Sequence, residues 1–141
     1  MATKLNITNF PTGYQSLITN GKHAIVGDEP LNSKGTDLGF SPPELLLSGI
    51  AMCKAATVRF IARKNGWEIG NVDAELTQET KRGEDGRLST KIATAISIEG
   101  DLSEEQKKEL LAQADRCYVV RMIEGDWEIE HATEMKKEVA A

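Results

Sequence analysis

The chain has 141 residues, a length typical of one domain with its own hydrophobic core. Hydrophobic residues make up 40%, charged residues 28%, and the formal net charge is −5, which argues against a nucleic-acid-binding surface. The first residues, MATKLNITNF, contain no apolar signal region. We therefore expect a cytoplasmic protein with reduced cysteines. Two histidines and no CxxC motif predict no metal site, and no cofactor is expected.

Three short strands are predicted in residues 4–28, where apolar and polar residues alternate. The second strand covers residues 14–19, and the third covers residues 23–26 after an Asn20-Gly21 turn signal. Residues 27–40 are rich in Gly, Pro, Asp and Asn and predict a loop. A loop of this length in a compact domain is often functional.

A long helix is predicted over residues 41–66, SPPELLLSGIAMCKAATVRFIARKNG. Ser41 and Glu44 have the spacing of a capping box, and Gly66 is a natural stop. The first half is apolar on nearly every side, which predicts a buried central helix. Because Lys54 interrupts the apolar part, we expect it to be too short to span a membrane, and no membrane association is expected.

The remaining elements alternate between the two kinds of periodicity. Two antiparallel strands are predicted within residues 72–98, joined at Asp85-Gly86. A helix follows from Ser103 to about Cys117, then a last strand over residues 127–131. The tail, residues 134–141, is expected to be a frayed end or short helix. The order βββ-α-ββ-α-β predicts one α+β domain over residues 1–141.

Cys53 is the first candidate for chemistry. A free cysteine often serves as a small buried hydrophobe. One helical turn away, however, lie the small residues Gly49, Ala56 and Thr57. Small neighbours leave room for a substrate or another backbone, so a functional thiol and a packing residue both stay open.

Cys117, at the end of the second long helix, is either buried packing or a resolving thiol for Cys53. The separation in sequence does not show whether the two meet, because a disulfide requires neighbouring Cα atoms. Cys53 lies more than three turns into its helix, where the helix dipole has little effect. An activating cation must then come from another element. The candidates are Lys22, His23, Lys34 and Arg121.

Glu44 is a tempting catalytic carboxylate, but its capping role is a strong alternative. Nine residues separate it from Cys53. At about 100° and 1.5 Å per residue, the two lie on nearly opposite faces and about 13 Å apart along the axis. We expect no direct contact between them.

The two cysteine-bearing segments, SPPELLLSGIAMCKAATVRFIARKNGW and GDLSEEQKKELLAQADRCYVVRMI, resemble the OsmC/Ohr family, and most closely its OsmC-like branch. The resemblance covers residues 20–133. It implies an intertwined homodimer in which sheets from both chains wrap two central cysteine helices, with active sites at the interface. It also implies a thiol peroxidase. Cys53 would be oxidised by an organic hydroperoxide, Cys117 would form a disulfide with it, and an external dithiol would reduce that disulfide.

The chain departs from the family's peroxidases around the thiols. Their thiolate is held by an arginine from the N-terminal strands, whereas the first arginine here is Arg59. Their glutamate ten residues before the cysteine is replaced by Pro43, with Glu44 one position later. After the second cysteine, Tyr118 and Val120 replace a proline and a histidine.

Two alternatives to a peroxidase therefore stay open. The first is a dimer that keeps the scaffold for small-molecule binding or redox sensing. The second is a structural role for both thiols. Arg121 is retained after the second cysteine, and the missing N-terminal arginine favours the first alternative over a peroxidase.

Overall fold

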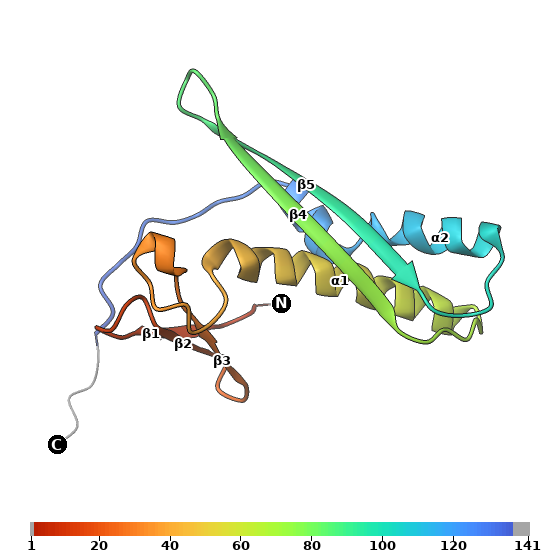
Figure 1. Cartoon of the computed structure of the whole chain (residues 1–141), viewed down its shortest axis with the longest axis horizontal. Coiled ribbons are helices and arrows are strands. Elements are labelled where there is room, and N and C mark those ends of the chain that lie inside the picture. Colours follow the sequence, from red (N-terminus) through yellow and green to blue (C-terminus); the bar gives the residue numbers. More distant parts are fainter. Residues whose placement is uncertain (1, 137–141) are drawn as a thin grey trace.

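The computed structural model describes residues 2–136 and has an α+β fold, as predicted. A long helix, α1, lies between a small N-terminal sheet at one end and a hairpin and a second helix along its length (Figure 1). The elements in chain order are β1 (Asn6–Asn9), β2 (Ser16–Thr19), β3 (Ala24–Gly27), the 3-10 turn η1 (Leu31–Ser33), α1 (Pro42–Lys64), β4 (Val72–Arg82), β5 (Leu88–Ile98), α2 (Glu104–Ala114) and α3 (Tyr118–Glu124).

The N-terminal sheet confirms the three predicted strands. Its order is β1-β2-β3, with antiparallel pairing throughout. Gly21 in the β2–β3 turn has φ of 92°, a conformation that glycine adopts without a Cβ clash. The chain then passes through the loop containing η1 and returns beside the sheet, where Phe40 bridges Gly27 before α1 begins.

The start of α1 also follows the prediction. Glu44 Oε1 accepts hydrogen bonds from the Ser41 N–H at 3.0 Å and the Ser41 hydroxyl at 2.9 Å. Arg63 and Lys64 occupy the last turn, where cations interact favourably with the helix dipole.

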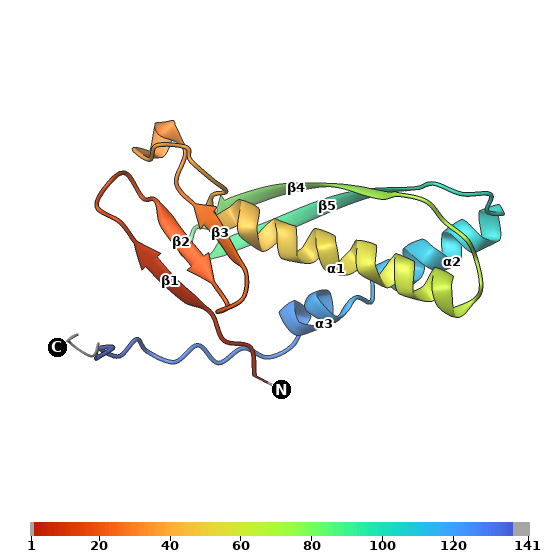
Figure 2. The ribbon, with the colours of Figure 1, turned by 90° about the horizontal axis from the view of Figure 1, so that it is seen from below.

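The hydrophobic core lies where α1 meets α2 and the hairpin. Val58 and Ala62 of α1 pack with Leu110 and Ala114 of α2, and all four are buried. The β4–β5 hairpin covers this contact, with its strands in register from Val72 opposite Ile98 to Arg82 opposite Leu88. Figure 2 shows α1 between this hairpin and α3.

Within one chain, α1 is buried along one stripe only, contrary to the predicted burial on all sides. The stripe consists of Ile50, Lys54, Val58 and Ala62. Other apolar side chains of the helix face outward, and Met52 is 76% exposed. The sequence pattern indicates how much of a helix is apolar, but it does not indicate which of its sides other elements of the chain cover.

The prediction that α1 is too short to span a membrane was wrong by length and composition, because its mean hydropathy reaches 1.6 over an 18-residue window. This is weak evidence for a span, since core helices pass the same test. The positioning of Lys54 in the stripe against α2 matches a core helix.

Two predictions in the C-terminal part were wrong. The second long helix ends at Ala114, and Cys117 is instead the N-cap of the separate helix α3. Residues 126–136 form neither strand nor helix, so the order is βββ-α-ββ-α-α. Alternating apolar and polar residues suit a strand, but a strand also needs a neighbouring strand with which to form hydrogen bonds. The expected tail lies outside the described residues from 137 onward.

Candidate functional site

The two cysteines are brought together from distant parts of the chain. Cys53 on α1 is partly buried, and Cys117 at the start of α3 is 1% exposed. Both are free thiols. They are neighbours, because Cys53 is among the groups that shift the pKa of Cys117, and the N–H of Val119, two positions after Cys117, donates to Cys53 Sγ at 3.5 Å.

The first turn of α3 directs backbone N–H groups at both sulfurs. The N–H of Val119 donates to Cys53 Sγ at 3.5 Å. The N–H of Val120 donates to the Cys117 sulfur. These N–H groups have no carbonyl partner within the helix because they belong to its first turn. The sequence pattern predicts one helix that runs to about Cys117, so it does not indicate the free donors at the start of a separate helix.

Burial raises the pKa of the Cys117 thiol above its ordinary value. The N–H of Val120 lowers this pKa, Cys53 raises it through a hydrogen bond and through charge, and the Lys54 cation lowers it. The net result keeps Cys117 protonated at neutral pH. The two sulfurs therefore differ in their surroundings: one is partly accessible, and the other is a buried thiol.

A buried lysine lies beside the thiols. Lys54 is 8% exposed, and its Nζ lies 3.2 Å from Asp115 Oδ1 at the end of α2. Adjacent helix residues do not face each other, so Lys54 and Cys53 lie on different sides of α1. Lys54 faces the segment that carries Cys117. The sequence signal that could have identified Lys54 is a cation at a position within the apolar stripe of the helix.

A cavity of about 340 Å³ opens next to this ion pair. Residues of α1, β5 and α3 line it, including Ile50, Lys54, Thr94, Val120 and Glu124. The cavity therefore combines apolar and charged side chains, and two of its lining residues, Ile50 and Lys54, lie close to Cys53 along α1.

The other predicted site residues make no hydrogen bond or ion pair with either thiol in the described part of the chain. Glu44 belongs to the helix cap, where the Ser41 N–H and then the Ser41 hydroxyl lower its pKa, while burial opposes the shift. Lys22 and His23 lie in the β2–β3 turn, and both their N–H groups donate to Asn20.

Lys34 and Arg121 likewise make no hydrogen bond to a sulfur among the described residues, although the Arg121 N–H donates to the Cys117 carbonyl at 3.1 Å. Lys34 ends η1 in the left-handed conformation, with φ of 67°. The Arg121 guanidinium lies 6.0 Å from the centre of the Tyr118 ring. A supporting role for these two residues, and for Lys22 and His23, stays a prediction.

Asp28 organises the loop before α1, a role that the sequence pattern does not indicate. Its side chain is buried and accepts hydrogen bonds from three regions of the chain. Burial raises the pKa of Asp28, but the hydrogen bonds outweigh it and hold the pKa well below its usual range. The donors are the Thr36 hydroxyl and the N–H groups of Leu38, Glu29, Tyr14 and Thr36.

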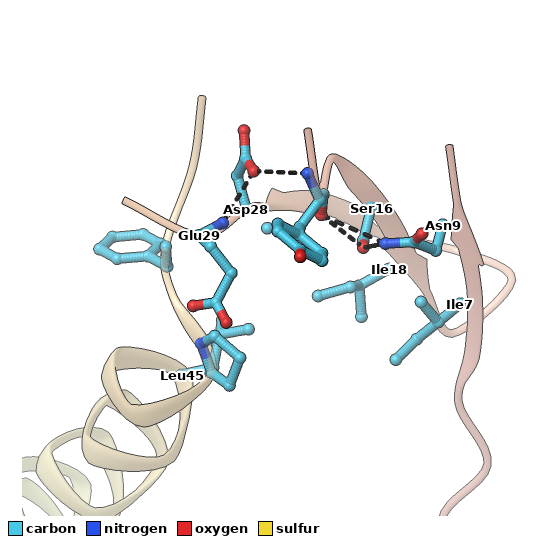
Figure 3. A pocket seen from close by; sticks show the side chains of 11 residues that line it. Ile7, Asn9, Ser16, Ile18, Asp28, Glu29 and Leu45 are labelled. Atoms are coloured by element: carbon cyan, nitrogen blue, oxygen red, sulfur yellow. Dashed lines mark hydrogen bonds between the residues drawn. The ribbon is translucent and has the colours of Figure 1, made fainter. Parts of the chain in front are cut away.

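This loop forms one wall of a second cavity, of about 280 Å³, between the N-terminal sheet and the first turn of α1. Its lining is mostly apolar and includes Ile7, Ile18 and Leu45. In Figure 3 the Glu29 side chain extends from the loop toward the start of α1, while the Asp28 carboxylate points toward its hydrogen-bond donors. Neither cysteine of the same chain lines this cavity.

The fold and the thiol pair define a class of α+β protein in which a cysteine on a long central helix meets a second cysteine from the C-terminal helices. A family model described as OsmC-like protein matches residues 35–132. The chain therefore belongs to the OsmC-like family, as its sequence motifs predicted. No curated protein sequence matches it significantly.

Solved structures share this fold at low sequence identity. An OsmC-like protein from Mycoplasma pneumoniae has a TM-score of 0.76 and 22% identity, with 89% of each chain covered. A putative osmotic stress induced and detoxification response protein from Psychrobacter arcticus has a TM-score of 0.73 and 23% identity, covering 86% of this chain and 88% of that chain. The organic hydroperoxide resistance protein OhrB of Bacillus subtilis has a TM-score of 0.65 and 18% identity, covering 89% and 93%.

Proposed function

We propose that the protein is a thiol-dependent peroxidase that reduces organic hydroperoxides in oxidative-stress defence. The observation that carries this proposal is the pair of neighbouring free thiols, of which Cys53 receives the Val119 N–H. Cys53 is the more accessible of the two, so a peroxide reaches it first. The shared fold with OhrB, an organic hydroperoxide resistance protein, supports the same class of substrate.

The chemistry uses each sulfur once. The Cys53 thiolate attacks one oxygen of the hydroperoxide, the O–O bond breaks, and the alkoxide takes a proton to leave as an alcohol. Cys53 is then a sulfenic acid. The sulfur of Cys117 attacks it, an S–S bond forms, the S–O bond breaks, and the oxygen leaves with two protons as water. An external dithiol reduces the disulfide.

The N–H of Val119 is the backbone donor that contacts the sulfur of the first nucleophile, at 3.5 Å. A backbone donor at sulfur stabilises negative charge there, and the start of a helix is where such donors are free. In the family's peroxidases an N-terminal arginine holds the thiolate. In this chain we infer that the start of α3 takes over part of that task.

The proposed assembly is a cytoplasmic homodimer with a single domain in each chain. The supporting observation is apolar surface on α1 that one chain leaves exposed, including Leu46, Met52 and Phe60. Exposed apolar patches of this kind mark interaction sites. The extended segment after α3, with Trp127 and Ile129 exposed, adds further apolar surface (Figure 2).

The test is to mix reduced protein with cumene hydroperoxide and follow free thiols and intact mass. Native protein should lose both thiols, with a mass decrease of two hydrogens. Cys117→Ser should stop at the sulfenic acid, which dimedone traps. Cys53→Ser should be inert, and native-like reactivity of this variant would refute the assignment of Cys53.

A second candidate function is small-molecule binding, which the cavity beside Glu29 favours. Its size is near the lower end of the range for small-molecule sites, roughly 300 Å³. Thiols that resist hydroperoxide, together with a saturable rise in melting temperature on adding an alkylamine, would support this function. Loss of that rise in Glu29→Gln would locate the ligand.

A further inference from the structure

Lys54 occupies an unusual place for a cation. It lies near the centre of the buried stripe of α1 and is 8% exposed. A buried ammonium is costly unless it is paired. Its hydrogen-bond partner in the described residues is Asp115, at 3.2 Å, whose own side chain is 79% exposed. The pair thus joins the middle of α1 to the end of α2.

The ion pair and the thiol pair connect the same two segments. Lys54 directly follows Cys53, and Asp115 precedes Cys117 by two positions. The segment from Asp115 to Cys117 joins α2 to α3, with Asp115 as the C-cap of α2 and Cys117 as the N-cap of α3. It retains turn bonds, such as that from the Cys117 N–H to the Ala114 carbonyl at 3.2 Å. Among the described residues, the Lys54–Asp115 pair is the ion pair that fastens this segment to α1.

We propose that Lys54 is a positioning residue for disulfide formation: its ion pair with Asp115 holds the turn that carries Cys117 against α1, so that Cys117 stays within reach of oxidised Cys53. The proposal rests on the proposed peroxidase cycle and concerns its second step. In that step Cys117 sulfur bonds to Cys53 sulfur, and the sulfenic oxygen leaves as water. A disulfide forms only when the Cα atoms approach to about 4.4–6.8 Å.

The position of Lys54 predicts a selective effect. The first step needs only Cys53 and peroxide, and Lys54 does not contact that sulfur directly. The second step depends on the relative placement of two segments. A displacement of about 1 Å can slow a reaction about a hundredfold.

The variant that tests the proposal is Lys54→Met, which keeps the length of the side chain and removes its charge. Rapid quenching after addition of cumene hydroperoxide, with dimedone trapping and intact mass, separates the two steps. Sulfenic acid should form at the native rate, and disulfide should appear about ten- to a hundredfold more slowly. Lys54→Arg, which can restore the ion pair, should recover most of the native rate. Asp115→Asn should reproduce the slow second step.

Two controls separate positioning from general stability. Lys107→Met breaks the exposed Lys107–Glu104 pair and should leave both steps unchanged. Val58→Ala opens the α1–α2 core and should lower the melting temperature without slowing the second step. Native disulfide formation in Lys54→Met would overturn the proposal. So would a slowing in Val58→Ala equal to that in Lys54→Met.

A peroxide-independent measurement keeps this inference distinct from the proposed function. In glutathione redox buffers, the Lys54→Met thiol pair should have an effective concentration about tenfold or more below that of native protein. An unchanged value would refute the positioning role. Native protein that forms no sulfenic acid with hydroperoxide would refute the peroxidase proposal, while the glutathione equilibrium would still test Lys54.

Discussion

Asp28 carries much of the structure of the loop before α1, because one buried carboxylate accepts hydrogen bonds from the β1–β2 turn and from both ends of the loop. A carboxylate has two acceptor oxygens and no donor, which suits a loop that presents N–H and hydroxyl groups from several sides. The position cannot be replaced by an amide without losing acceptors.

We therefore predict that Asp28→Asn lowers the melting temperature at neutral pH, since the amide nitrogen would face donors. The pKa of Asp28 is lowered on folding, so its stabilisation is present above the unfolded pKa, near 4, and is lost as pH falls through the folded pKa. Thermal unfolding between pH 2 and 7 should show the two proteins converging below about pH 4. A difference that does not change with pH would contradict this role.

Cys117 provides a second prediction at the scale of one residue. Burial raises its pKa, so it should stay a thiol at pH 8 and react slowly with iodoacetamide in Cys53→Ser. The partly exposed Cys53, measured in Cys117→Ser, should react faster. Because the Cys117 pKa is raised, any stability linked to its proton is present at neutral pH and lost as pH rises through the folded pKa. Equal alkylation rates would contradict the difference in environment.

At the scale of elements, α2 is the support from which the turn carrying Cys117 projects. Its start is a capping box in which the Gln106 N–H donates to Ser103 Oγ at 3.1 Å and the Ser103 N–H donates to Gln106 Oε1 at 2.8 Å. The sequence motif predicted this arrangement because both partners lie within one turn of each other.

Ser103→Ala should destabilise the protein by about 1 kcal/mol, the usual cost of losing an N-cap. Urea unfolding monitored by circular dichroism measures this change. Ser89→Ala, at an exposed position of β5, provides the matched control and should have little effect. An equal loss of unfolding free energy in both variants would mean that the N-cap of α2 does not contribute to stability.

At the scale of the whole molecule, the outward side of α1 is an apolar surface that one chain leaves exposed. The proposed dimer predicts that Met52→Lys would place a charge in an apolar interface. Sedimentation should then report the mass of one chain, against twice that mass for native protein. Leu31→Lys changes an equally apolar but separate exposed position in η1 and should remain dimeric. Native protein that sediments as one chain would refute the dimer.

Local order in this protein could be predicted from the sequence because its causes lie within a few residues of one another. The capping boxes, the Asn20-Gly21 turn and the alternation in β4 and β5 are all of this kind, and together they specified the α+β class. The last strand failed as a prediction because Trp127 and Ile129 have strand periodicity but no neighbouring edge in the described chain.

The candidate site, by contrast, was decided by tertiary structure. The cysteines were visible in the sequence, but the contacts that give them a chemical role join distant positions. The Val119–Cys53 hydrogen bond spans 66 positions, and the Lys54–Asp115 pair spans 61. Helix periodicity states which residues share a face, and it contains no information on what packs against that face. Only the folding of α3 and the end of α2 onto α1 brings a backbone donor and a second thiol to Cys53, and a carboxylate partner to Lys54.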